Sequence, residues 1–303
     1  MDNTLVSYAH SIQPNRDYRT LTSNNLNDDI VNYYESCYWD YRFAWANAKN
    51  LALHYGYWDP ETRSHNDSLL NMNRVLAQQV RVSEFDHVLD AGCGIGGSTI
   101  WLAENHRARV SGITLSEKQV QQARRFAQKR GVLDRVNFQC EDFCNTSFDD
   151  ESFDVVWGLE SVCYAVQKRA FVKEAYRLLK KGGRLVIADG FAKRREFTEK
   201  EWRILVLCLN GWSVPNLATA DEMKSYIGDC CFTDIVYRDI SEHTLPSARY
   251  MVRTALLHYP VHKISCLLGL RSEVQTANYL AGFYQYFLMK NGISGYGIIS
   301  AVK

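Results

Sequence analysis

Glycines follow an apolar run in "HVLDAGCGIGG", and an acidic residue precedes them. Gly92, Gly94 and Gly97 let the backbone turn tightly and approach a ligand closely. Their spacing satisfies the dinucleotide pattern GxGxxG, which alone is weak evidence. Asp90, two positions before the first glycine, would face a pyrophosphate unfavourably, whereas it suits a ligand with an amino group and a cationic sulfonium. A glycine turn without any ligand is the alternative.

A second candidate for chemistry is Glu160, which ends the apolar part of "FDVVWGLESVCYAV" at 153–166. Burying an unpaired carboxylate is costly, so something must compensate its charge. A cationic ligand or intermediate would do so, and a carboxylate beside it could act as a general base. The other interpretation is that Glu160 anchors the tyrosine-rich amino-terminal segment through hydrogen bonds.

The elements around these residues follow from the alternation of short β-rich runs with longer amphipathic ones between residues 86 and 189. That alternation predicts βαβ units and a parallel sheet. The glycine loop then lies between a strand and a helix, and Glu160 lies at the carboxyl end of the fourth strand, where such sheets bind ligands.

Local signals mark two of the helices. Ser116 with Gln119 resembles a capping box that begins a helix over 116–130, and Gly131 would end that helix. Gly182 and Gly183 are expected to end the helix over 167–180 in the same way.

Four consecutive segments are expected along the chain. The first is a helical amino-terminal cap segment over 1–80, followed by a cofactor-binding α/β core over 81–194. A lid or substrate region over 195–290 includes a core strand near 233–240, and the last core strand lies within 291–303.

The glycine loop resembles motif I, DxGxGxG after a hydrophobic strand, of the class I S-adenosylmethionine-dependent methyltransferases. The runs "VSGITLSEKQ", "CEDF", "FDVVWGLES" and "LLKKGGRLVIAD" follow in the order typical of that family. The resemblance implies an enzyme with a Rossmann-like seven-stranded sheet, mostly parallel with an antiparallel last strand, and S-adenosyl-L-methionine as cofactor. A nicotinamide or flavin enzyme, and a binding protein that keeps the fold without catalysis, are the alternatives.

At the end of the second strand the family usually has an acid that holds the ribose hydroxyls, and this chain departs from that pattern. Its "GITLSxxQ" form is similar to a subgroup that contains cyclopropane fatty acid synthases, sterol C-methyltransferases and tocopherol methyltransferases. The resemblance assigns polar contacts to Thr114 and Gln119, adenine packing to Leu115, and the adenine amino group to Asp142. Helix capping alone is the alternative role of Gln119, and Asp142 could be a plain loop charge. The implied cofactor-binding residues are Asp90, Gly92, Cys93, Gly94, Thr114, Leu115, Gln119, Asp142, Phe143 and Leu159.

Aromatic side chains are dense on both sides of this core, which suits a large apolar or unsaturated acceptor, although rings at helical spacing also pack as core. Their faces can stabilise a carbocation. Arg249 and Arg253, at helical spacing, could clamp a diphosphate or carboxylate, or form a solvated face. The predicted substrate-binding residues are Tyr33, Tyr164, Trp212, Arg249, Tyr250, Arg253 and Tyr284.

Carbocations arise when an alkene attacks the methyl group, as in the resembled sterol and cyclopropane enzymes. We therefore expect C-methylation of an isoprenoid alkene, either a prenyl diphosphate or a related terpenoid or sterol. The aromatic segments, the run "ESVCYA" and the arginines together suggest the prenyl diphosphate. Glu160 is the expected base, and Tyr34 and His54 are the other catalytic candidates. Mg²⁺ would be needed only if the acceptor is a diphosphate, and no metal site is predicted. The alternative reaction is N- or O-methylation of a small amine, alkaloid or phenol.

The composition limits which partners and which cellular location we expect for the protein. Lys and Arg total 35 against 34 for Asp and Glu, so no charge field favours nucleic acid or an anionic membrane. The nine cysteines contain no CxxC pair, which predicts reduced thiols and a cytoplasmic location. The apolar runs are too short for stable membrane insertion. The expected partner is a small hydrophobic substrate, and homo-oligomer formation stays open.

Overall fold

A seven-stranded sheet forms the centre of the part of the chain that the computed structural model describes, residues 23–45 and 50–303. The strand order is β3-β2-β1-β4-β5-β7-β6. Neighbouring strands from β3 to β5 pair in parallel, whereas β7 is antiparallel to both β5 and β6. The predicted Rossmann-like sheet with an antiparallel last strand is therefore confirmed. The strands are β1 (His87–Ala91), β2 (Arg109–Thr114), β3 (Val136–Cys140), β4 (Phe153–Leu159), β5 (Leu179–Ala192), β6 (Thr233–Asp239) and β7 (Ser294–Val302).

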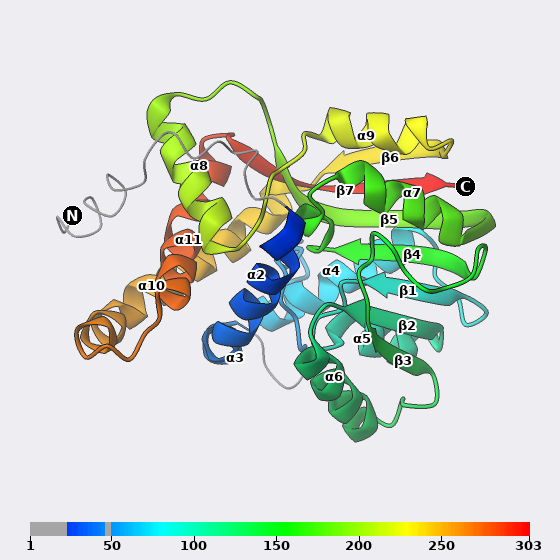
Figure 1. Cartoon of the computed structure of the whole chain (residues 1–303), viewed down its shortest axis with the longest axis horizontal. Coiled ribbons are helices and arrows are strands. Elements are labelled where there is room, and N and C mark those ends of the chain that lie inside the picture. The colour runs from blue at the N-terminus through cyan, green and yellow to red at the C-terminus, as the bar shows by residue number, and fades with distance from the viewer. Residues whose placement is uncertain (1–22, 46–49) are drawn as a thin grey trace.

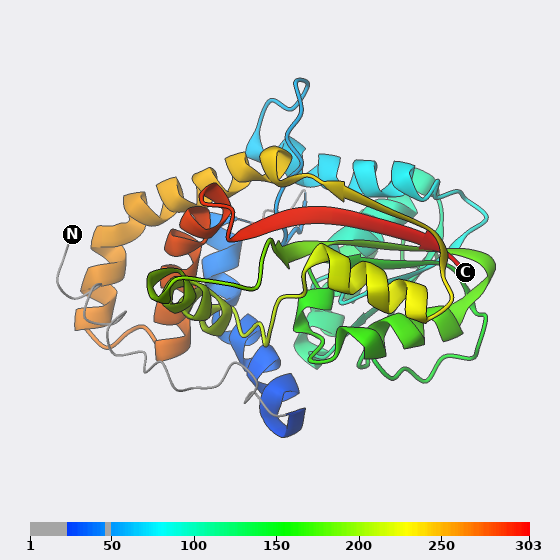
Figure 2. The ribbon, with the colours of Figure 1, turned by 90° about the horizontal axis from the view of Figure 1, so that it is seen from above.

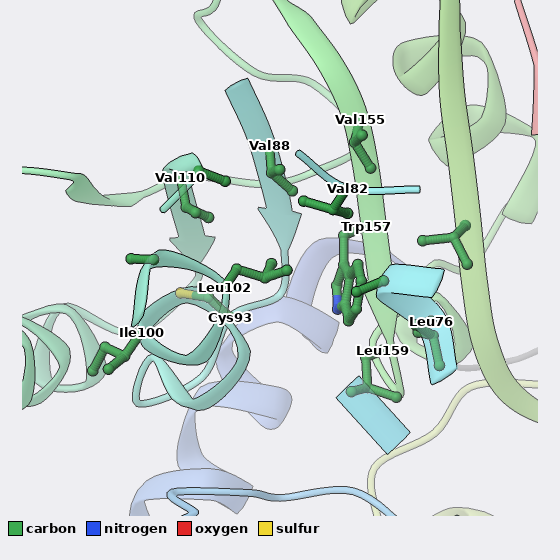
Figure 3. Packing of buried hydrophobic residues seen from close by; sticks show 14 of the residues in the cluster. Leu76, Val82, Val88, Cys93, Ile100, Leu102, Val110, Val155, Trp157 and Leu159 are labelled. Atoms are coloured by element: carbon green, nitrogen blue, oxygen red, sulfur yellow. The ribbon is translucent and has the colours of Figure 1, made fainter. Parts of the chain in front are cut away.

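The central strands are apolar on both faces because helices cover both sides of the sheet. Successive side chains of a strand point to opposite faces, so Trp157 of β4 joins one buried cluster while its neighbour Val156 joins the other. Figure 3 shows Trp157 together with Val88 of β1 and Leu76 from the first cluster. This explains why the sequences of the central strands are nearly continuous apolar runs.

Three α-helices contribute buried residues to the cluster around Trp157, and two α-helices contribute to the opposite one. The first three are α4 (His65–Gln79), α5 (Gly97–His106) and α6 (Glu117–Arg130). The opposite cluster includes residues of α7 (Lys168–Leu178) and α9 (Ala220–Asp229). Such two-sided cover leaves the carboxyl ends of the parallel strands as the edge where loops can build a site.

Further helices gather beyond the end of the sheet to which the arrowhead of β4 points (Figure 1). They are α2 (Ser23–Ser36), α3 (Tyr38–Ala44), α8 (Glu199–Gly211), α10 (Ser241–Leu267) and α11 (Glu273–Lys290), and the short helix η1 (Val162–Tyr164) follows β4. Figure 2 shows α10 and α11 extending away from the strands. None of the described helices is long and apolar enough to cross a bilayer.

The predicted ends of two helices had different outcomes. Ser116 caps α6 by accepting the backbone N–H of Gln119, and Gly131 ends that helix with φ of 70°, as expected. The prediction that Gly182 and Gly183 end a helix was wrong, because α7 stops at Leu178. Leu179 already pairs with β4, so both glycines lie inside β5.

Candidate active site

The glycine loop between β1 and α5 is held by contacts with the segments on either side. The backbone N–H groups of Gly92 and Cys93 both donate to the carbonyl oxygen of Ile113, at 2.9 and 2.8 Å. Gly92 has φ of +91°, and a Cβ added there would lie 2.3 Å from Cβ of Ser161. Ser161 in turn donates to the carbonyl oxygen of Ala91 over 2.5 Å. Glycine is therefore required at 92 by both conformation and space.

A cavity lies against this loop, and we call it the glycine-loop cavity. All the predicted cofactor-binding residues except Asp142 line it. Residues of α2 (Ile30, Val31 and Tyr34) and the segment Leu51–His54 close its other side. The full lining is Ile30, Val31, Tyr34, Leu51, Ala52, Leu53, His54, Asp90, Gly92, Cys93, Gly94, Gly97, Ser98, Thr114, Leu115, Ser116, Gln119, Glu141, Phe143, Leu159, Glu160, Ser161 and Tyr164.

Asp90 is the buried carboxylate of this cavity. Its Oδ2 accepts a hydrogen bond of 2.6 Å from the Thr99 hydroxyl of α5. Burial raises the pKa of Asp90 to about 6, although the hydrogen bonds from Thr99 oppose the rise. A cationic group placed against this carboxylate would lower its pKa and favour the charged form.

Thr114 and Gln119 form a polar pair at the end of β2. The Thr114 hydroxyl donates to Oε1 of Gln119 over 2.5 Å, and the Gln119 backbone N–H bonds to the Ser116 side chain at 3.3 Å. In a full capping box the glutamine side chain would bond to the backbone of Ser116. Here it bonds to Thr114 instead, so the Gln119 backbone takes part in the cap while its side chain belongs to the cavity wall.

Asp142 does not reach the glycine-loop cavity. Its Oδ1 accepts the backbone N–H of Cys144 at 2.8 Å, and its Oδ2 accepts from the Asn27 amide of α2 at 3.4 Å. The preceding residue, Glu141, lines the cavity, and its carboxylate also binds the backbone and hydroxyl of Ser147. Of the two acidic residues after β3, only Glu141 therefore lines this cavity.

A second cavity adjoins the first, and we call it the tyrosine cavity. Five tyrosines line it, namely Tyr34, Tyr41, Tyr55, Tyr164 and Tyr296. Tyr34, Leu53, His54, Glu160 and Tyr164 line both cavities, so they form the boundary between them. Among the described residues no lysine or arginine contributes to the tyrosine cavity.

Glu160 on that boundary is held by two donors. Its Oε1 accepts the backbone N–H of Tyr55 at 2.5 Å and the phenolic O–H of Tyr296 at 2.7 Å. Burial raises the pKa of Glu160 from 4.5 to about 8, because these two hydrogen bonds only partly offset the loss of solvation. A base with a pKa near the working pH is well matched to proton transfer.

The backbone of Glu160 is also unusual. Its φ is +48°, a left-handed conformation that costs a non-glycine residue about 1–2 kcal/mol. Its N–H donates to the carbonyl oxygen of Ala188 in β5 at 2.9 Å, which holds this conformation. Strain of this kind gathers at functional sites, where the surrounding structure over-determines the geometry.

Two buried charged residues position the segment that follows Glu160. Asp189 of β5 accepts the backbone N–H of Cys163 at 2.8 Å. The Lys168 ammonium donates to the carbonyl oxygens of Cys163, Ala165 and Asn216 at 2.7, 2.6 and 3.0 Å. Together they orient η1, from which Tyr164 points to both cavities.

The other two catalytic candidates, Tyr34 and His54, also line both cavities. The Tyr34 hydroxyl donates to the Tyr164 hydroxyl at 3.0 Å, and that hydroxyl donates to the carbonyl oxygen of Trp212 at 3.1 Å. Nδ1 of His54 lies 2.8 Å from the carbonyl oxygen of Tyr55, and burial lowers the pKa of His54 to about 4. At neutral pH His54 is therefore uncharged and a weaker base than Glu160.

The predicted substrate-binding residues separate into two groups. Tyr164 and Trp212 line the tyrosine cavity. Tyr33 lines neither cavity, but its ring centre lies 5.0 Å from that of Tyr34, which lines both. Four others line neither this cavity nor the glycine-loop cavity: Tyr284, Tyr250, Arg249 and Arg253.

Arg249 and Arg253 lie on the exposed face of α10, opposite the face that carries Met251 and Ala255. In a helix of 3.6 residues per turn, positions 249 and 253 are about half a turn from those two residues. Arg249 lies over the ring of Tyr286, and Tyr250 stacks on His65. Neither arginine, each predicted as part of an anion clamp, lines the glycine-loop cavity or the tyrosine cavity.

Several residues of the site were not singled out from the sequence. Tyr55 and Tyr296, the two donors to Glu160, lie 105 and 136 positions from it along the chain. Tyr55 belongs to an aromatic-rich segment, which indicated a role for the segment but not for this residue. Tyr296 lies in an apolar strand between two glycines, and nothing in that pattern indicated a role in the site. Within residues 23–45 and 50–303, no group of three or more His, Cys, Asp or Glu side chains is placed to hold a metal ion.

Comparisons with known proteins identify methyltransferases as relatives of this chain. A family model described as a methyltransferase domain matches residues 89–187. The chain is 32% identical over 200 residues to 27-O-demethylrifamycin SV methyltransferase of Amycolatopsis mediterranei, which covers 64% of this chain and 71% of the relative. It is 27% identical over 278 residues to chloroplastic tocopherol O-methyltransferase of Arabidopsis thaliana, covering 86% of this chain and 78% of that protein.

Solved structures share the fold. Geranyl diphosphate C-methyltransferase from Streptomyces coelicolor A3(2), solved with Mg²⁺, geranyl diphosphate and S-adenosyl-L-homocysteine, superposes with a TM-score of 0.70. The alignment covers 93% of this chain and 99% of that one, at 21% identity. At this identity the likeness is evidence for the fold alone.

Proposed function

The chain belongs to the class I S-adenosylmethionine-dependent methyltransferases, and from this premise we propose that it methylates a hydroxyl group of a large, uncharged and predominantly apolar acceptor. Glu160 would take the proton that the hydroxyl loses. One observation carries the proposal: Glu160 lies on the boundary shared by the glycine-loop cavity and the tyrosine cavity. A base at this boundary would meet both a bound cofactor and a bound acceptor.

The glycine-loop cavity fits the cofactor by the chemistry of its lining. Gly92 and Gly94 allow close approach of the backbone, and Asp90 provides a carboxylate for an amino group. Thr114 and Gln119 provide polar contacts, while Leu115, Phe143 and Leu159 provide apolar walls for a base ring. When bound, S-adenosylmethionine supplies an electrophilic methyl group on a sulfonium. The cavity residues would orient it and exclude water.

The charge of the tyrosine cavity argues against an anionic acceptor. No lysine or arginine of the described residues lines it, and Arg249 and Arg253 lie on the far face of α10. A diphosphate would therefore lose its hydration without gaining the cations that usually compensate it. The relative from A. mediterranei is named for methylation at an oxygen, which agrees with a hydroxyl acceptor.

C-methylation of an isoprenoid alkene is the second candidate, and the ring of tyrosines favours it. Tyr34, Tyr41, Tyr55, Tyr164 and Tyr296 all line the cavity that Glu160 enters. Aromatic faces stabilise cations, and a cationic intermediate would form beside them. In this reaction Glu160 would remove a proton from the carbon next to the cationic centre.

Incubation with methyl-labelled S-adenosylmethionine tests both candidates. The acceptors would be phenols with apolar side chains, hydroxylated macrocycles, sterols, prenyl diphosphates and small amines, with products identified by mass spectrometry. A labelled methyl ether on an apolar hydroxyl compound supports the first candidate, and a C-methylated alkene selects the second. Labelling of the amines or the diphosphates alone would overturn the proposal.

The role of Glu160 has its own control. Glu160→Gln keeps the size of the side chain, so S-adenosylhomocysteine should bind with unchanged affinity in calorimetry. Turnover should fall by about 10²–10⁴, the usual contribution of a general base. Full turnover in this variant would reject the role of Glu160 as the base.

A further inference from the structure

A third and larger cavity lies among α3, α10 and α11, and we call it the outer cavity. It has a volume of about 500 Å³, within the range of small-molecule sites. One face of α10 lines its length, from Met251 through Ala255 and His258 to Ser265. At 1.5 Å per residue this stretch of helix spans roughly 21 Å. Figure 2 shows how far α10 extends from the sheet.

The outer cavity begins where the tyrosine cavity ends. Tyr41, Trp45, Trp212 and Met251 line both, so these four side chains form their common boundary. The tyrosine cavity shares its opposite boundary, which includes Glu160, with the glycine-loop cavity. The three cavities therefore follow one another in a row, with Glu160 at the inner boundary and Met251 at the outer one.

The lining of the outer cavity is apolar over much of its surface. The rings of Trp39, Trp45, Trp212 and Tyr279 contribute to it, and Val261 adds an aliphatic side chain. Flat rings of this kind provide large contact areas for apolar ligands.

The charged groups of the outer cavity cancel one another. Asp40 and Arg271 are the charged side chains among its described lining, and they form a bidentate pair at 3.0 and 2.7 Å. His262 stacks on Tyr279 with ring centres 3.8 Å apart, and burial lowers the pKa of His262 to about 4, so it is uncharged at neutral pH. Such a lining offers no unpaired cation to a phosphate.

We propose that the outer cavity binds the non-reacting part of the methyl acceptor, an extended, uncharged and apolar arm that passes Met251 while the reacting group lies beside Glu160. This inference rests on the proposed function for the identity of the reacting group. It adds that the acceptor is long enough to extend from Glu160 past Met251 into the outer cavity. Small amines and phenols without a side arm would then be poor substrates.

A homologous series of alkoxyphenols, from methoxy to dodecyloxy, tests this assignment by binding alone. Affinities would be measured by calorimetry in the presence of S-adenosylhomocysteine. Each methylene that enters the outer cavity should strengthen binding by roughly fourfold, since burying one is worth ~0.8 kcal/mol. These increments should continue beyond the chain length that fills the tyrosine cavity.

Two tryptophan substitutions on α10 form a matched pair. Ala255→Trp would fill the outer cavity, whereas Leu257→Trp adds the same ring at an exposed position that does not line it. Ala255→Trp should abolish the increments for long chains and leave the affinity of the methoxy compound unchanged. Leu257→Trp should behave as the wild type. Equal behaviour of the two variants, or no dependence on chain length in the wild type, would overturn the proposal.

A third variant tests the same assignment in case Ala255→Trp does not fold. Ser265→Phe narrows only the outer end of the cavity, so it should lower the chain length at which the increments stop. Circular dichroism would verify the fold of each variant. Because none of these measurements needs turnover, failure of methyl transfer and failure of long-chain binding are separate results.

Discussion

The phenolic hydroxyl of Tyr296 in β7 donates a 2.7 Å hydrogen bond to the carboxylate of Glu160, which follows β4. These strands are not neighbours, because β5 lies between them. The same hydroxyl lies 3.4 Å from the carbonyl oxygen of Ala188 in β5, so the phenol reaches across that strand. The antiparallel last strand of the sheet thus supplies a residue that controls the proposed base.

Tyr296→Phe should raise the pKa of Glu160 further. The lost hydrogen bond stabilises the charged carboxylate, so removing it favours the protonated form. The ascending limb of the pH profile of kcat/KM, which lies near pH 8 if Glu160 is the base, should then move up by about one pH unit. Tyr284→Phe, which removes a phenol outside the tyrosine cavity, is the control and should leave the limb in place.

Glu160→Gln should change how stability depends on pH. The pKa of Glu160 is raised from 4.5 to about 8 in the folded protein, so its stabilising contribution is complete below pH 4.5 and is lost as pH rises toward 8. In that window the free energy of unfolding of the wild type should fall relative to that of the variant by about 1.4 kcal/mol per pH unit. Urea denaturation across the window measures this. Glu242→Gln, at an exposed position on α10, should show no such trend.

Gly92→Ala should destabilise the protein more than Gly131→Ala does. Both glycines have positive φ, at +91° and +70°, so each substitution carries a backbone cost of about 1–2 kcal/mol. Only at Gly92 would the new Cβ also overlap Ser161, since no atom lies within 4 Å of the position at Gly131. Thermal unfolding and the affinity for S-adenosylhomocysteine check this, and equal losses in both would contradict the steric argument.

Glu141→Gln should weaken cofactor binding more than Asp142→Asn. Glu141 lines the glycine-loop cavity, whereas Asp142 binds Cys144 and Asn27 outside it. A lost charge-assisted hydrogen bond corresponds to roughly a tenfold change in the dissociation constant. Calorimetry with S-adenosylhomocysteine compares the two variants, and the opposite ranking would restore the assignment that the sequence suggested.

Arg249→Ala and Arg253→Ala should leave turnover of an uncharged acceptor within about twofold of the wild type, because surface substitutions away from a site have small effects. Trp212→Ala should raise KM strongly, since its ring lines both the tyrosine cavity and the outer cavity. Steady-state kinetics on the same acceptor compare the three. A large rise in KM for either arginine variant would support the anion clamp and count against an uncharged acceptor.

The sequence by itself determined the sheet, the glycine loop and the family resemblance. These depend on short-range relations along the chain: the period of apolar residues within an element, and the spacing of Asp90, Gly92 and Gly94 between a strand and a helix. The position of a side chain at the end of a strand follows from the position of that strand in the sheet. For this reason Thr114 and Glu160 could be located without a structure, whereas Asp142, in the turn after β3, does not line the glycine-loop cavity.

Only the tertiary structure decided what surrounds Glu160 and how large the acceptor site is. Tyr55 and Tyr296 lie far before and far after Glu160 in the sequence, and their contacts with it depend on how separate elements pack. The same packing turns Arg249 and Arg253 toward solvent and Ala255 toward the outer cavity. The direction of a side chain on a helix is set by the rotation of that helix against its neighbours, which no local pattern in the sequence specifies.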